Sequence, residues 1–114
     1  MLLDLHGTEV HRDDGYAWRI HAWQVPQTKE IPHGIRYSLT LHDQYNTRVL
    51  GYDNAHAVKP PKRGRVTGKR VVYDHLHRTP HDKGVPYEFD SPAQLLEDFF
   101  TKVDEVIHER EQQR

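Results

Sequence analysis

The C-terminal segment carries the pattern that most restricts the fold. Ser91 is a typical helix N-cap, Pro92 suits the first helical position, and Gln94 stands where a capping box needs it. The pattern predicts a helix over about residues 92–110, with an apolar stripe that must be buried against a partner. The stripe consists of Leu95, Leu96, Phe99, Phe100, Val103, Val106 and Ile107.

The preceding part of the chain can supply a sheet as that partner. Apolar and polar residues alternate over 16–23 and again over 35–42, which is the period of half-buried strands. Three further strands are expected over about 47–54, 69–77 and 85–89, the last at an edge, and the buried side of 69–77 stays undecided. With 114 residues there is room for one core. We therefore predict a single α+β domain over 1–114, an antiparallel sheet of four to five strands with the helix packed on one face.

The polar residues of the two clearest strands fall on one side of the sheet, because side chains alternate across a strand. They make this side cationic and rich in histidine: Arg19, His21, Arg36, Ser38, Thr40 and His42. Arg19, Arg36 and His42 are therefore candidate RNA-binding residues. An ordinary solvated face of an antiparallel sheet would have the same pattern, and this alternative stays open.

A basic loop joins the third and fourth expected strands. Pro60 and Pro61 end regular structure, and Gly64 and Gly68 predict a flexible segment over about 57–69. Six basic residues without an acid occur in this region: Lys59, Lys62, Arg63, Arg65, Lys69 and Arg70. Such a patch can bind phosphates of RNA although the net charge of the chain is −1. A solvated loop without a ligand is the competing interpretation.

Side chains suited to acid–base chemistry gather at the two ends of this loop. The candidates for catalysis are Tyr52, Asp53, Asn54, His56, Asp74, His75 and His77. RNA cleavage without a metal needs a base for the 2′-hydroxyl, an acid for the leaving 5′-oxygen and cations for the phosphorane. Imidazoles titrate in the right range. His56, His75 and His77 could therefore supply base and acid, without a cofactor.

Two other interpretations use the same residues. His75 and His77 stand two positions apart, so a third ligand such as His56, His42 or Asp53 would complete a zinc or manganese site of a metal-dependent hydrolase. A lone H-x-H pair is frequent by chance. In the third interpretation the histidines have no chemical role and the chain is a non-catalytic interaction protein.

Several classes of protein are excluded by what the sequence lacks. Without cysteine there are no disulfides and no thiolate metal sites. The N-terminus has no signal-peptide pattern, and no segment approaches the roughly 20 apolar residues of a membrane span, so we expect a cytoplasmic protein without a membrane partner. Neither a P-loop nor a dinucleotide fingerprint is present, which argues against ATP-driven and dinucleotide chemistry.

Two motifs resemble those of the TumE-type toxins of prokaryotic toxin–antitoxin systems. Tyr52-Asp53-Asn54-Ala55-His56 is followed by Asp74-His75-Leu76-His77 and then by the amphipathic helix, and the similarity covers about residues 10–108. Asp74 replaces a histidine of the family pattern, and the basic loop is an insertion. The chain therefore resembles a divergent member.

The resemblance implies a small RNA-cleaving toxin that inhibits growth. It also implies a partner, an antitoxin with a helix-turn-helix DNA-binding domain. The positions that match the family motifs make up the expected functional set: Tyr52, Asp53, Asn54, His56, His75 and His77. An inactive toxin homologue and a homodimer remain open at this point.

Overall fold

The computed structural model describes residues 2–54, 75–77 and 85–113, and of His75, His77 and Val85 it describes the backbone alone. A short 3-10 helix, η1 (Leu2–Leu5), precedes six strands and one long helix. The elements that follow η1 are β1 (Thr8–His11), β2 (Ala17–Gln24), β3 (Ile35–His42), β4 (Arg48–Asp53), β5 (His75–His77), β6 (Val85–Pro86) and α1 (Pro92–Gln112).

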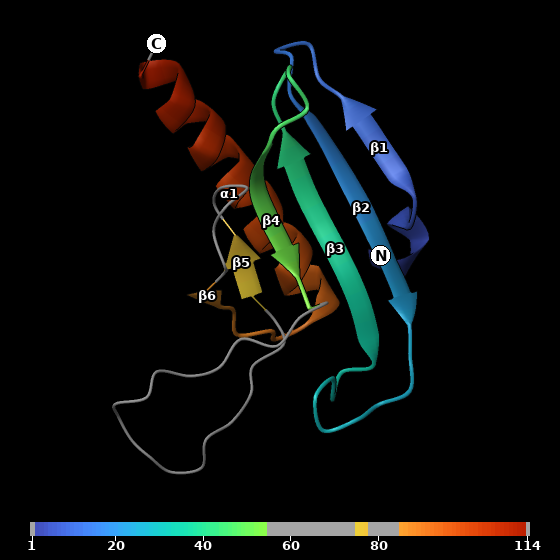
Figure 1. Ribbon diagram of the computed structural model, residues 1–114. Helices are drawn as coiled ribbons and strands as arrows, with labels where there is room; N and C mark the ends of the chain where they lie inside the picture. Colours follow the sequence, from blue (N-terminus) through green and yellow to red (C-terminus); the bar gives the residue numbers. More distant parts are fainter. Residues whose placement is uncertain (1, 55–74, 78–84, 114) are drawn as a thin grey trace, which may run out of the picture.

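The strands form one antiparallel sheet in the order in which they occur in the chain, and α1 lies across one of its faces (Figure 1). This confirms the predicted α+β architecture. The sheet has six strands instead of four or five, because β1 pairs with the outer edge of β2. The fourth expected strand is described over β5 only, and the rest of 69–77 lies outside the described residues.

The core lies between the sheet and α1. Most inward side chains of β2, β3 and β4 and four residues of the helix stripe are almost completely buried, and each buried large side chain contributes roughly 1.5–3 kcal/mol. The other stripe residues, Leu96, Phe100 and Ile107, are partly buried against this core. Trp18 adds an edge-on contact with Phe100, with ring centroids 5.1 Å apart. The main members of the core are Ile20, Tyr37, Leu39, Leu41, Leu50, Tyr52, Leu95, Phe99, Val103 and Val106.

The start of α1 has the predicted cap. Ser91 Oγ accepts the backbone N–H of Gln94 at 3.1 Å. The Gln94 side chain donates from Nε2 to Asp98 Oδ1 at 2.8 Å. Asp98 Oδ2 also accepts the hydroxyl of Tyr87 at 2.6 Å. The bond from Tyr87 connects the segment before α1 to the helix, and the bond from Gln94 connects the first two turns of the helix.

The turn between β3 and β4 is built around Asp43. Its Oδ1 accepts the backbone N–H groups of Tyr45 and Thr47, both at 2.9 Å. Asn46 has a φ of 64°, in the left-handed region that asparagine tolerates better than most residues. The strand register shifts next to this turn, between Leu41 and His42. The turn therefore places Asn46 close to the end of β3.

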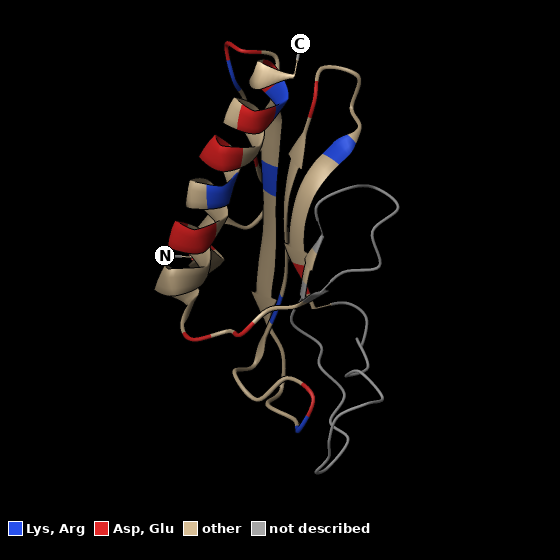
Figure 2. Cartoon of the chain, turned by 90° about the vertical axis from the view of Figure 1, so that its left-hand side faces the viewer, with Lys and Arg blue, Asp and Glu red and all other residues tan. Residues whose placement is uncertain are grey.

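The two layers differ in charge. Acidic residues follow the length of α1, whereas arginines occur on the strands (Figure 2). Residues 88–111 contain eight acids against Lys102 and Arg110. The outer surface of the helix layer is therefore the acidic side of the domain. No helix in the described part of the chain is long and apolar enough to cross a bilayer.

Candidate functional site

The side of the sheet opposite α1, here called the open face, arranges its residues in rows across the strands. Residues in one row stand opposite each other in adjacent strands, so a row brings together positions that are distant in the sequence. The register defines two neighbouring rows, Glu9, Arg19, Thr40, Gly51 and His77 in the first and His21, Ser38, Asp53 and His75 in the second.

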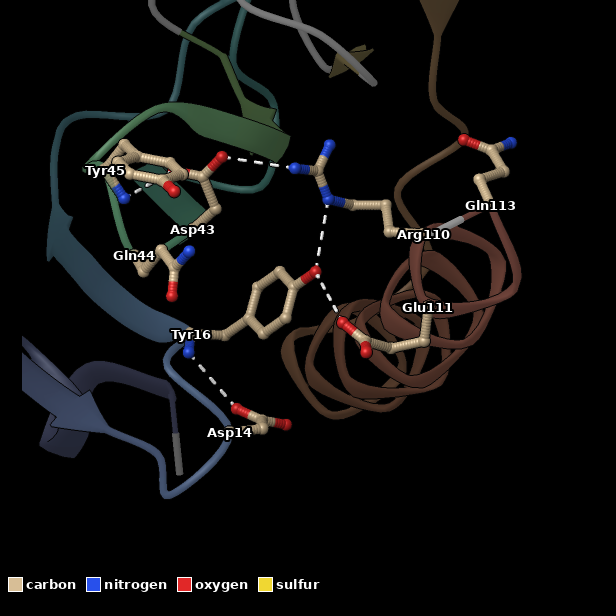
Figure 3. A pocket seen from close by; sticks show the side chains of 8 residues that line it. All are labelled: Asp14, Tyr16, Asp43, Gln44, Tyr45, Arg110, Glu111 and Gln113. Carbon is tan, nitrogen blue, oxygen red and sulfur yellow. Dashed lines mark hydrogen bonds and ion pairs between the residues drawn. The ribbon is translucent and has the colours of Figure 1, made fainter.

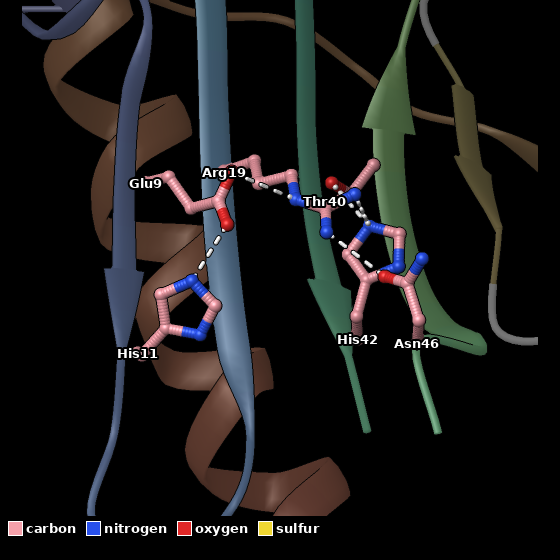
Figure 4. Close-up of polar contacts among 6 residues, drawn as sticks. All are labelled: Glu9, His11, Arg19, Thr40, His42 and Asn46. Atoms are coloured by element: carbon pink, nitrogen blue, oxygen red, sulfur yellow. Dashed lines mark hydrogen bonds and ion pairs between the residues drawn. The ribbon is translucent and has the colours of Figure 1, made fainter. Parts of the chain in front are cut away.

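Arg19 lies at the centre of a polar cluster on the first row (Figure 4). Its Nη2 donates to Asn46 Oδ1 at 2.8 Å, and its Nη1 lies 3.4 Å from His42 Nε2. Its Nε forms an ion pair with Glu9 Oε1 at 3.3 Å, without hydrogen-bond geometry. Thr40 Oγ1 is 3.0 Å from His42 Nε2. Two of the predicted RNA-binding residues, Arg19 and His42, are thus in direct contact.

His42 is held in its neutral form. Burial and then the charge of Arg19 lower its pKa below the ordinary value, the Asn46 backbone opposes them, and Arg48 and Asp43 have smaller effects of opposite sign. Because arginine can only donate, a hydrogen bond from Arg19 requires His42 Nε2 to be the acceptor. At neutral pH His42 therefore brings no full positive charge to the open face.

The open face is less cationic than the sequence predicts. β1 places Glu9 beside Arg19, and Glu9 Oε2 also lies 2.7 Å from His11 Nε2. The sequence does not predict Glu9 and His11 as site residues because it shows no strand pattern there, and it does not predict Asn46 because this residue lies in a turn. The signal that could have found Asn46 is its place in Asp43-Gln44-Tyr45-Asn46, a hairpin loop next to His42.

Two of the predicted catalytic residues have their side chains in the core. Tyr52 is 2% exposed and meets the rings of Tyr87 and Phe99 edge-on, at centroid distances of 5.0 and 6.1 Å. Asn54 is 0% exposed, and its amide bonds the backbone of β3. Both residues continue the inward series that begins at Leu50. The structure therefore gives them contacts that support the sheet.

Asp53 lies between these two residues and belongs to the open face. The register pairs it with Ser38 on one side and with His75 on the other. Leu76 packs against the core, which shows that the Leu76 side of β5 is the buried one. The described parts of the two sequence motifs therefore lie on adjacent strands, with Asp53 opposite His75.

Arg36 and Arg48 add positive charge around these rows. Arg36 Nη1 donates to the backbone carbonyl of Asn54 at 3.4 Å, so its guanidinium lies beside the end of β4. Arg48 lies over Gly51, since a Cβ added at Gly51 would be 2.6 Å from Arg48 Nη1. The missing side chain of Gly51 thus leaves the space that the Arg48 guanidinium fills.

The other predicted site residues lie outside the described residues: His56, Lys59, Lys62, Arg63, Arg65, Lys69, Arg70 and Asp74. The alternative metal site of His56, His75 and His77 is not among the described side chains either. Within 2–54, 75–77 and 85–113, no group of three or more His, Asp or Glu side chains could hold a metal ion.

A pocket lies where the end of α1 meets the sheet (Figure 3). Arg110 donates from Nη2 to Asp43 Oδ2 at 3.1 Å and from Nε to the Tyr16 hydroxyl at 3.2 Å. The Tyr16 hydroxyl in turn lies 3.5 Å from Glu111 Oε2. These contacts join the end of α1 to the residue before β2 and to the turn after β3, so we assign the lining of this pocket to the docking of α1.

The family model of the toxin TumE matches residues 6–107. The chain belongs to the TumE toxin family. The match includes every strand of the sheet and the apolar stripe of α1, and it confirms the resemblance found in the motifs. Membership supports a toxin of a toxin–antitoxin system and, in general terms, an antitoxin as its partner. No curated protein and no solved structure matches the chain.

Proposed function

We propose that this TumE-family chain is an endoribonuclease toxin that works without a metal ion. One observation carries the proposal, namely the register that pairs Asp53 with His75. It brings two motifs that are distant in the sequence onto neighbouring strands, and both motifs contain groups suited to proton transfer. The family supports the toxin role, and the chemistry of the residues supports the reaction.

The proposed reaction is an attack within the RNA chain. A base removes the proton of a 2′-hydroxyl, the 2′-oxygen bonds to phosphorus, and the bond to the 5′-oxygen breaks as an acid protonates that oxygen. The products are a 2′,3′-cyclic phosphate and a 5′-hydroxyl. Two imidazoles, one neutral and one protonated, can perform both transfers at neutral pH. We assign these roles to two of the three residues His56, His75 and His77.

Asp53 and the nearby arginines would support these steps. A carboxylate in the row of His75 is suited to orient an imidazole and to stabilise its protonated form. Arg19 and Arg36 of the open face, together with the basic residues of 59–70, would contact phosphates and stabilise the phosphorane. The acidic outer surface of α1 would repel RNA, which favours approach from the open face.

The proposed partner is an antitoxin with a helix-turn-helix domain, as the family resemblance implies. Co-expression of a neighbouring reading frame of this type should restore growth. Size-exclusion chromatography with light scattering of the purified toxin and of the complex would give the stoichiometry and test for a homodimer.

The deciding experiment is cleavage of an end-labelled RNA in the presence of EDTA. We expect products with a cyclic phosphate, and a rate about 10²–10⁴-fold lower in His75→Ala, because one proton-transfer group is lost. His11→Ala is the matched control, an exposed histidine on β1, and should keep full activity. Thermal melts would verify that both variants fold.

Other outcomes would reject the proposal. Cleavage that requires added manganese or zinc would identify a metal-dependent hydrolase instead. Growth arrest that persists in His75→Ala, without cleavage of RNA by the wild-type protein, would indicate a toxin with another target.

A further inference from the structure

We propose that Trp23 forms a subsite of the open face on which an unpaired nucleobase stacks. The inference rests on the proposed ribonuclease function and deepens it, because it names single-stranded RNA as the form of the substrate. The occupant is a base of the bound strand, and the subsite lies beside the row that contains Asp53 and His75.

The first observation is the exposure of a large aromatic ring on the open face. Trp23 is 44% exposed near the end of β2, while its neighbour Ala22 is 1% exposed and points inward. The other large apolar side chains with high exposure in the described part of the chain lie elsewhere: Leu3 in η1, Val10 opposite Trp18, and Tyr45 in a turn. Trp23 is therefore the exposed aromatic platform of this face among the described residues.

The ring of Trp23 is supported from one side. The His6 ring meets it edge-on, with centroids 5.7 Å apart and an interplanar angle of 68°, and makes a similar contact with His21. His6 is itself fixed, because its Nδ1 accepts the backbone N–H of Ala22 at 3.1 Å. A ring held in this way loses little freedom when a ligand stacks on it.

Positive charge next to the ring favours RNA as the occupant. The cross-strand partner of Trp23 is Arg36, and Arg19 also belongs to the open face. Single-strand binding proteins combine such cations, which contact phosphates, with aromatic rings on which bases stack. Bases in a duplex are already stacked and cannot use the platform, so the subsite requires an unpaired base.

The position of the ring suits a substrate that also reaches the proposed active row. Trp23 and Arg36 directly follow the row of His21, Ser38, Asp53 and His75. From β2 to β5 there are three strand spacings, which amount to roughly 14 Å at about 4.8 Å each. One RNA strand lying across the sheet can therefore contact both places.

The test uses a fluorescently labelled single-stranded oligonucleotide with 2′-O-methyl groups, which cannot undergo attack by a 2′-hydroxyl. Its binding can be measured by anisotropy whether or not the protein cleaves RNA. Loss of one stacked base weakens binding by about 5- to 100-fold, and we expect this loss for Trp23→Ala. Trp23→Phe should retain most of the affinity. Tyr45→Ala is the matched control, since it removes a 79% exposed aromatic ring outside the subsite.

Salt dependence separates stacking from phosphate contacts. Trp23→Ala should leave the slope of log K against log salt unchanged, because stacking releases no counterions. Arg36→Gln should reduce the slope by about 0.7, the value for one phosphate contact on a single strand. A change of slope in Trp23→Ala would contradict the stacking role.

The outcomes distinguish this inference from the proposed function. Equal affinity of Trp23→Ala and wild type, or tighter binding of a duplex than of the single strand, would overturn the subsite and leave the ribonuclease proposal to the cleavage assay. Binding that depends on Trp23, without cleavage of unmodified RNA, would support the subsite and reject the ribonuclease. Absence of binding by the wild-type protein would overturn the subsite.

Discussion

The side chain of Asn54 accepts the backbone N–H of Tyr37 at 3.0 Å, and it donates to the carbonyl of Ile35 at 2.7 Å. Asn54 is 0% exposed, and an unsatisfied buried group costs about 1–3 kcal/mol. Asn54→Ala should therefore lower the free energy of unfolding by about 2–4 kcal/mol, measured by urea denaturation. Gln24→Ala, at the exposed end of β2, should change it by less than about 0.5 kcal/mol. Similar values for the two variants would contradict this account.

His42 should titrate below its ordinary range. Burial and the charge of Arg19 lower its pKa, so the unfolded chain binds this proton more readily than the folded protein does. The free energy of unfolding should therefore fall as the pH drops below about 6.5, and it should fall less in His42→Gln. NMR titration of the ring would give the pKa, which Arg19→Gln should raise. A pKa at or above the ordinary value would show that the cluster does not act on His42.

The contact of Arg110 with Asp43 should couple the end of α1 to the sheet. Asp43 is only 12% exposed and Arg110 is 42% exposed, so we expect a coupling free energy near the upper end of the surface range, about 1 kcal/mol. A double-mutant cycle with Arg110→Gln and Asp43→Asn would measure it. The exposed pair Lys102 and Glu105 is the control, with a smaller coupling of about 0.3 kcal/mol. Equal coupling free energies for the two pairs would mean that burial of Asp43 does not strengthen its ion pair with Arg110.

Removal of the helix cap should destabilise the domain. Ser91→Ala leaves the N–H of Gln94 without its side-chain acceptor, which typically costs about 0.5–2 kcal/mol. The loss should appear in the free energy of unfolding and as faster amide exchange in the first turn of α1. Ser91→Asp, which preserves an acceptor, should restore most of the stability. If Ser91→Asp lost as much stability and exchanged its amides as fast as Ser91→Ala, the capping role of Ser91 would be contradicted.

Most of the fold could be predicted from the sequence because burial is one-sided in its main elements. β3 alternates buried and half-buried residues along its whole length, and α1 buries one stripe. β1 lacks this signal, since its residues at positions 8–11 are all at least partly exposed. An edge strand with little burial has no apolar row that distinguishes it from a loop.

The candidate site was harder to predict. Alternation starting from Leu50 places Tyr52 and Asn54 inward and Asp53 outward. All three side chains carry polar groups, so their residue types do not indicate which of them are buried. The pairing of Asp53 with His75 depends on strand register, and a shift of one residue would reverse the faces of β5. Local patterns contain no information on which residues of two distant strands stand opposite each other.

Inward and outward residues alternate along β2 and β3, so residues that form the core and residues of the proposed binding surface occupy different sides of one sheet. Outward positions such as Ser38 and Trp23 can therefore mutate without repacking the core. If the open face binds RNA as proposed, a lineage that carries this sheet can change what its toxin recognises one residue at a time while keeping its stability. A library randomised at the outward positions should consequently consist mainly of folded proteins.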